Sequence, residues 1–136
     1  MILADSSVWI DYFNDAPISD TVEFFLLRDE LCVNDVILAE LLPSIRHREE
    51  THLESLLFQL PRLRMWIDWN ELVIMQTENL RHGINKVGLP DLMIVQNTIQ
   101  NNVTLLSSDK HFSLMNQICK FDLYHDGNED GLISIK

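Results

Sequence analysis

The sequence predicts an α/β fold in which helices cover both faces of a central parallel sheet. Short apolar runs of strand length alternate with longer segments whose apolar residues recur at helical spacing. Ser, Asp or Asn, the residues that favour helix starts, follow the apolar runs. This alternation is typical of a single domain with a parallel sheet of about four to five short strands in an α/β/α sandwich.

The first strand–helix unit is formed by residues 1–13, MILADSSVWIDYF. The apolar residues 2–4 predict a buried strand, and the apolar residues of 8–13 predict a helix with Ser6 or Ser7 as its N-cap. Asp5 then lies where the strand ends, at the edge where open parallel sheets bind ligands. A single carboxylate there more often supports a helix cap, so a chemical role depends on other acids reaching the same edge.

The remaining elements continue this alternation. Pro43 lies inside one predicted helix, where it removes an internal hydrogen bond. Residues 62–69 fit either a strand or an extended connector, and no repeat, linker or low-complexity segment divides the chain. Helices are predicted over residues 19–29, 35–45, 49–58, 71–86, 90–99 and 110–117, and strands over 31–33, 103–106 and 121–124.

Length and composition indicate an ordinary globular domain. The 136 residues are 46% hydrophobic and 23% charged, and no apolar run is long enough to span a membrane. The N-terminus has no basic region before its apolar run, so we expect no signal peptide and a cytoplasmic location. Cys32 and Cys119 are too few for a disulfide framework and are expected to be free thiols.

The charge balance constrains the partners. Ten Lys and Arg against 21 Asp and Glu give a formal charge of −11. A protein that binds nucleic acid by charge alone would be basic. The sequence therefore favours a chain that meets polyanions through metal ions, or one whose partner is positively charged.

Four acids are predicted to reach one edge of the sheet. Asp5 and Asp109 follow predicted strands, whereas Glu40 and Asp91 lie in the helices that come after strands or turns. Right-handed crossovers bring the carboxyl ends of parallel strands together, so these side chains should meet. Carboxylates that converge raise one another's pKa unless a cation is present, and their oxygens suit Mg²⁺ or Mn²⁺. Such a site would support hydrolysis of a phosphate ester.

Four segments resemble the signatures of a known family. LADSSVWIDYF, VNDVILAELL, GLPDLMIVQN and LLSSDKHFSLM are similar, in order and spacing, to those of the PIN domain, in particular the VapC toxins of bacterial toxin–antitoxin pairs. The resemblance spans nearly the whole chain. It implies a PIN-like nuclease domain over residues 1–125 and a short polar C-terminal tail over 126–136.

The resemblance also implies an activity and its residues. It describes the toxin of a type II toxin–antitoxin (VapBC) pair: a homodimeric endoribonuclease that uses Mg²⁺ or Mn²⁺, cuts structured RNA such as tRNA and is inhibited by a cognate antitoxin. Asp5 and Asp91 would bind metal directly, and Glu40 and Asp109 would complete the shell directly or through water. Supporting hydroxyls would come from Ser6 or Ser7, with Ser7 counted among the catalytic residues, and from Ser107 or Ser108.

Two features depart from the family pattern. Gln96 and Asn97 replace a small alanine pair that family members often carry, and Pro43 is unusual after Glu40. We expect these departures to affect helix packing more than chemistry.

Basic residues are concentrated in one stretch. It is a candidate surface for RNA approach, with a solvated helix face as an equally good interpretation. Three further cations, Arg81, Lys86 and Lys110, lie near the acidic segments and have the same two interpretations. The basic stretch comprises Arg46, His47, Arg48, His52, Arg62 and Arg64.

The C-terminal residues match the start of a calcium-binding loop. Asp126, Asn128, Asp130 and Gly131 have the offsets of an EF-hand, but the chain ends before the closing Glu and no helix precedes the loop. A polar, glycine-rich turn is the preferred interpretation.

Other functional classes fit less well. A phospho-receiver signalling domain shares the size, sheet and acidic cleft, but this chain has Ser6 and Ser7 where receivers carry a second acid. A haloacid dehalogenase-type phosphatase needs an acid where Ser7 stands. No serine lies in a nucleophile elbow, and His111 is expected at the surface or in a helix cap. A non-catalytic interaction module of PIN fold remains an alternative.

Overall fold

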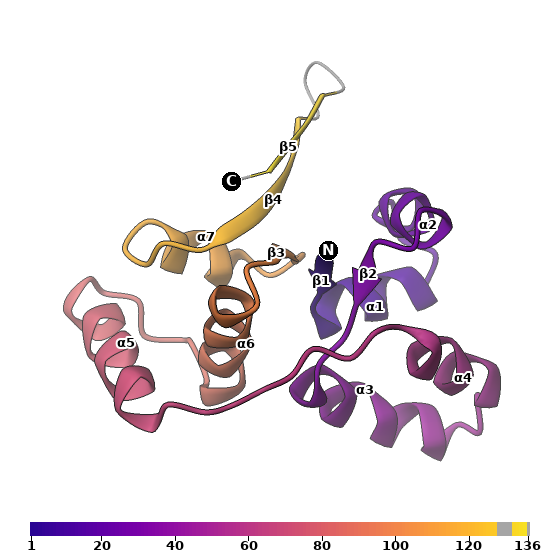
Figure 1. Ribbon diagram of the computed structural model, residues 1–136, viewed down its shortest axis with the longest axis horizontal. Helices are drawn as coiled ribbons and strands as arrows, with labels where there is room; N and C mark the ends of the chain where they lie inside the picture. The colour runs from indigo at the N-terminus through magenta and orange to yellow at the C-terminus, as the bar shows by residue number, and fades with distance from the viewer. Residues whose placement is uncertain (128–131, 136) are drawn as a thin grey trace.

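A five-stranded sheet forms the centre of the protein. The computed structural model describes residues 1–127 and 132–135 (Figure 1). The strand order is β2-β1-β3-β4-β5, with parallel pairing among the first four strands and antiparallel pairing of β5 with β4. The predicted parallel sheet is therefore confirmed. The strands are β1 (Ile2–Ala4), β2 (Leu31–Cys32), β3 (Thr104–Leu106), β4 (Asp122–Gly127) and β5 (Leu132–Ile135).

The last two strands differ from the sequence prediction. Residues 126 and 127 continue β4, and residues 132–135 add β5, so this stretch pairs with the sheet instead of forming only a polar tail. The two strands extend away from the rest of the protein as a hairpin (Figure 1). Of the residues that match the start of a calcium-binding loop, Asn128, Asp130 and Gly131 lie outside the described residues.

Seven helices surround the sheet in the described part of the chain. Their positions follow the sequence prediction closely, but one cap and one end differ. Asp5, not Ser6 or Ser7, caps the first helix, and Ile18 precedes the second helix without a side-chain cap. The helices are α1 (Ser6–Phe13), α2 (Ser19–Leu27), α3 (Asp35–His47), α4 (Thr51–Gln59), α5 (Trp69–Arg81), α6 (Leu89–Gln100) and α7 (Lys110–Asn116).

Helix α5 ends at Arg81, five residues earlier than predicted. Gly83 adopts a φ of 75°, in the left-handed region that glycine tolerates best. The amide of Ile84 then donates to the carbonyl of Asn79 at 2.8 Å, which closes the helix end.

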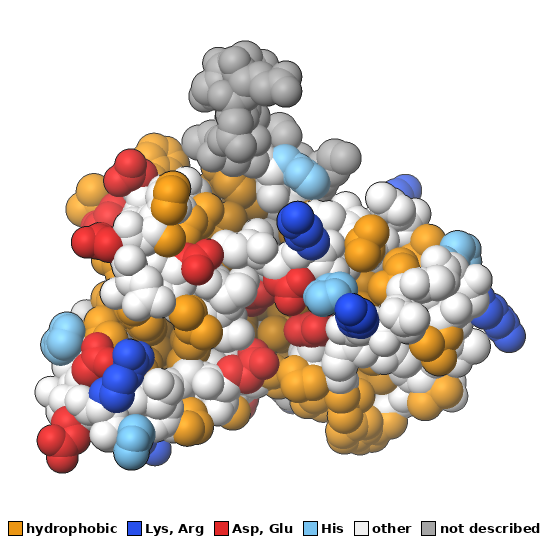
Figure 2. All heavy atoms as spheres, turned by 180° about the vertical axis from the view of Figure 1, so that it is seen from behind, with side chains coloured by type: hydrophobic (Ala, Val, Ile, Leu, Met, Phe, Trp, Pro, Cys, Tyr) orange, Lys and Arg blue, Asp and Glu red, His pale blue; other side chains and the backbone are white. Residues whose placement is uncertain are grey.

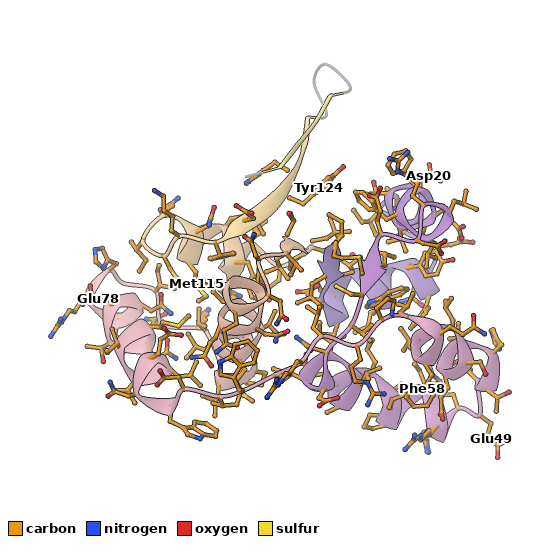
Figure 3. The ribbon with its side chains drawn as sticks, viewed as in Figure 1. Asp20, Glu49, Phe58, Glu78, Met115 and Tyr124 are labelled. Carbon is orange, nitrogen blue, oxygen red and sulfur yellow. The ribbon has the colours of Figure 1, made fainter. Side chains whose placement is uncertain are left out.

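The core lies between the sheet and the helices. Trp9 is fully buried and contacts Tyr12 and Phe13. On β4, Tyr124 meets Phe25 of α2 edge-on at 5.4 Å between ring centroids (Figure 3). Cys32 is a buried free thiol, and burial raises its pKa to about 11. Cys119 is also a free thiol and is partly buried. None of the described helices is long and apolar enough to cross a membrane.

Residues 62–69, which the sequence left open, form an extended connector. A parallel bridge joins Arg62 to Val33 beside the sheet. Farther on, α6 side chains bond the connector backbone: Asn97 and Asn101 donate to the carbonyl of Arg64, and Gln100 donates to that of Trp66. Amides on α6 therefore fix the route from α4 to α5.

Candidate active site

Asp5 occupies the turn between β1 and α1. Its amide donates to the carbonyl of Leu106, which fixes it to the end of β3. Its carboxylate is 3% exposed and accepts three hydrogen bonds. Oδ1 accepts from the Ser7 hydroxyl at 2.6 Å and the Val8 amide at 3.2 Å, and Oδ2 accepts from the Ser107 hydroxyl at 2.6 Å. Asp5 therefore caps α1, and hydrogen bonds fix the orientation of its buried carboxylate.

The loop after β3 forms the second side of the site. The Ser107 hydroxyl accepts from the Asp109 amide at 2.9 Å, and the Ser7 hydroxyl accepts from the Ser108 amide at 3.1 Å. These bonds join the ends of β1 and β3 through side chains. Asp109 caps α7 by accepting from the His111 amide, and the Nδ1 atom of His111 lies 2.8 Å from its Oδ1 atom.

Glu40 and Asp91 come from the two neighbouring helices. Glu40 lies in α3 and accepts a hydrogen bond from the Ser6 hydroxyl at 3.2 Å. Asp91 lies in the first turn of α6, where it also accepts a hydrogen bond from the backbone of Gly88. Asp91 thus lies in the first turn of its helix, and Glu40 lies in the first half of α3.

The pKa values show that the four acids interact. Burial raises the pKa of Asp5, which the charge of Asp109 raises further, against the hydrogen bonds from Ser107 and Ser7. Burial also raises the pKa of Glu40, to which the charges of Asp91 and Asp5 add.

Asp91 interacts electrostatically with Asp109 and His111. Burial raises its pKa, the charge of Asp109 raises it further, and the charge of His111 acts in the opposite direction. Each of the four carboxylates therefore lies within electrostatic reach of at least two of the others. Electrostatic interactions therefore link all four acids that the sequence singled out.

The chemistry of these donors fits a divalent metal. An ionised carboxylate has about four acceptor positions, so the three hydrogen bonds of Asp5 leave room for an ion. In the described part of the chain, no Lys or Arg forms an ion pair with any of the four acids. No three His, Cys, Asp or Glu side chains there are already spaced for metal binding. The acids interact with one another without a Lys or Arg partner among the described residues, and a hard cation would bring them closer.

A histidine lies beside one of these acids. Figure 2 shows Asp and Glu, His, and Lys or Arg side chains next to one another near the middle of one face. The sequence predicts His111 at the surface or in a helix cap but gives no indication of the contact between its ring and Asp109. The sequence feature that could have indicated this contact is the position of His111 two residues after Asp109, the N-cap of α7.

The basic stretch around α3 and α4 is largely neutralised. Arg46 pairs with Glu54, Arg48 with Glu50, and Arg62 with Asp35. Arg62 also lies over the ring of Phe58, which is labelled in Figure 3. These pairs favour the interpretation of a solvated helix face for these three arginines.

The fold and the acids define an α/β protein with an acidic cluster at the carboxyl edge of its parallel sheet. The profile of the PIN domain matches residues 2–117. The chain belongs to the PIN domain family. No curated protein sequence matches it significantly.

Three solved structures share the fold. DNA-bound VapBC from Salmonella typhimurium has a TM-score of 0.65 and 18% identity, over 82% of this chain and 89% of that one. VapBC2 from Rickettsia felis, bound to a DNA fragment from its promoter, has a TM-score of 0.66 and 21% identity, over 84% and 92%. PAE2754 from Pyrobaculum aerophilum has a TM-score of 0.56 and 12% identity, over 84% of each chain.

Proposed function

We propose that the protein is a divalent-metal-dependent endoribonuclease and the toxin component of a type II toxin–antitoxin system. The observation that carries this proposal is the set Asp5, Glu40, Asp91 and Asp109, whose members interact electrostatically and have no Lys or Arg partner within the described residues. Membership of the PIN family and structural likeness to VapBC complexes support it.

In this proposal Asp5 and Asp91 bind Mg²⁺ or Mn²⁺ directly, and Glu40 and Asp109 complete the site directly or through water. The ion supplies an activated water and stabilises charge at the phosphodiester during hydrolysis. Ser7 and Ser107 hold the Asp5 carboxylate by donating to its two oxygens. Because they are partly buried on both sides of Asp5, they keep its orientation fixed when substrate enters.

The substrate and partners follow from the same proposal. The substrate is RNA, with structured RNA such as tRNA as the first candidate. The net charge of −11 and the uncompensated acids suit an antitoxin that places Arg or Lys in the cluster. As in the toxins that the sequence resembles, we expect a homodimer.

RNA cleavage by the purified full-length chain tests the proposal. Protein stripped with EDTA should cleave a transcribed tRNA mixture after Mn²⁺ or Mg²⁺ is added, and Asp5→Asn and Asp91→Asn should not. Sequencing of the RNA ends after expression in cells, with Asp5→Asn as the control, would give the site of cleavage. Cleavage that persists in EDTA, or in both variants, would exclude this function.

A further inference from the structure

Two buried amide side chains connect the helices that carry Glu40 and Asp91. Asn34 is 0% exposed and Asn97 is 1% exposed. The Asn34 Nδ2 atom donates to the Asn97 Oδ1 atom at 2.9 Å. Asn34 also caps α3 by accepting from the Ile37 amide at 2.9 Å, and Asn97 donates to the carbonyl of Arg64 at 2.8 Å. Both amides are thus held on two sides, which leaves them little freedom to move.

The same two helices carry two of the acids at equal sequence distances from the amide pair. Glu40 comes six residues after Asn34, and Asp91 comes six residues before Asn97. Six helical residues span about 9 Å. Helices α3 and α6 contact each other, so the amide pair joins the two helices that carry these acids.

The hydrogen bond between Asn34 and Asn97 opposes separation of α3 from α6. A buried hydrogen bond costs free energy to break because its donor and acceptor find no water.

We propose that Asn34 and Asn97 form a clamp that sets the spacing between Glu40 and Asp91, and that they are positioning residues for the metal site. This inference rests on the proposed metal-dependent function. Gln96 provides a contrast, because it is equally buried on α6 but bonds Asp68 and Glu71 on the α5 side.

Metal binding by matched variants tests the clamp. Asn97→Leu removes the amide at similar volume, and Gln96→Met does the same one residue earlier. We expect both to lower the melting temperature, but only Asn97→Leu to weaken Mn²⁺ binding at least about tenfold in calorimetry below that temperature. Asn34→Thr, which keeps a capping oxygen for α3, should also weaken it. Unchanged affinity in folded Asn97→Leu and Asn34→Thr, or an equal loss in Gln96→Met, would overturn the proposal.

A second measurement needs no metal. In EDTA, Asn34→Thr and Asn97→Leu should each lower the urea midpoint, because each removes the buried bond between the two amides. The double variant should lose less stability than the sum of the two single losses, since both changes remove the same bond. Additive losses would contradict the clamp. If the unchanged protein bound no Mn²⁺, the proposed function would fail, while this comparison would still decide the clamp.

Discussion

The Ser107 hydroxyl lies 2.6 Å from Oδ2 of Asp5, although the two residues are 102 positions apart in the sequence. Ser7 makes the equivalent bond to Oδ1, also at 2.6 Å. Each hydroxyl donates to the carboxylate and accepts a backbone amide from the loop that follows β3. The metal-binding orientation of Asp5 therefore depends on a network that spans β1 and β3.

Loss of the Ser107 hydroxyl should impair the site without unfolding the protein. Ser107→Ala removes the bond to Oδ2 and frees the Asp109 amide, so we expect Mn²⁺ affinity or RNA cleavage to fall by about 10- to 100-fold. Ser108→Ala is the matched control, because Ser108 is exposed and only its backbone amide bonds the network. Equal activity of the two variants would show that the network does not support catalysis.

Replacement of Asp5 should separate activity from stability. Asp5→Asn keeps an oxygen that caps α1 but removes a charge that burial disfavours. We expect RNA cleavage to fall by about 10²–10³-fold or more, while the melting temperature in EDTA stays equal or rises. Circular dichroism and an RNA cleavage assay on the same preparation check both outcomes. A large loss of melting temperature would mean that Asp5 acts mainly in folding.

Metal should stabilise the protein in proportion to its binding. At a hundred times the dissociation constant, a ligand of the folded state adds about 2.7 kcal/mol, or about 9 °C in melting temperature for a chain of this size. Thermal melts with Mn²⁺ against EDTA measure this. Asp91→Asn should lose the increase, and Asp20→Asn, an exposed acid at the start of α2, should retain it.

The acids also predict how stability depends on pH. In EDTA, burial raises the pKa values of Asp5, Glu40 and Asp91 in the folded protein. The folded state then holds protons more tightly than the unfolded chain. The stability from these groups is full below their ordinary pKa values and is lost as pH rises through the raised values.

Urea unfolding between about pH 4 and 8 measures this trend. Glu40→Gln should be more stable than the unchanged protein at high pH, and the difference should disappear at the acidic end. A difference that grew as pH fell would mean that the pKa of Glu40 is lowered by folding. Saturating Mn²⁺ should also reduce the difference, because the cation compensates the charge.

The strands and the acids could be predicted because their signals are local. The apolar run before Asp5 and the one before Asp109 each end at a carboxylate, and the crossover rule alone places these ends together. The hydrogen-bond partners of the side chains could not be predicted in the same way. Ser6 and Ser7 looked like helix caps, but Asp5 accepts the Val8 amide, so both hydroxyls are left for the carboxylates.

The features that the sequence did not predict depend on distant partners. Gln96 and Asn97 depart from the family pattern, and we expect that departure to affect helix packing. Both are buried, and residues of a connector about 30 positions away supply their hydrogen-bond partners. The early end of α5 depends on the left-handed backbone of Gly83. The pairing of β5 with β4 requires a hairpin that a short apolar segment does not specify alone.

Removal of the internal proline of α3 should stabilise the protein. Pro43 has no amide hydrogen to donate to the carbonyl of Ala39. Because both residues are exposed, water can bond this carbonyl instead. Pro43→Ala supplies the missing bond and should raise the free energy of unfolding by about 1–3 kcal/mol in urea titration. Ser44→Ala, at the next exposed position, should change it by only a few tenths. Mn²⁺ affinity should not change, because the amide clamp holds α3 at its other end; altered affinity would mean that a bend at Pro43 positions Glu40.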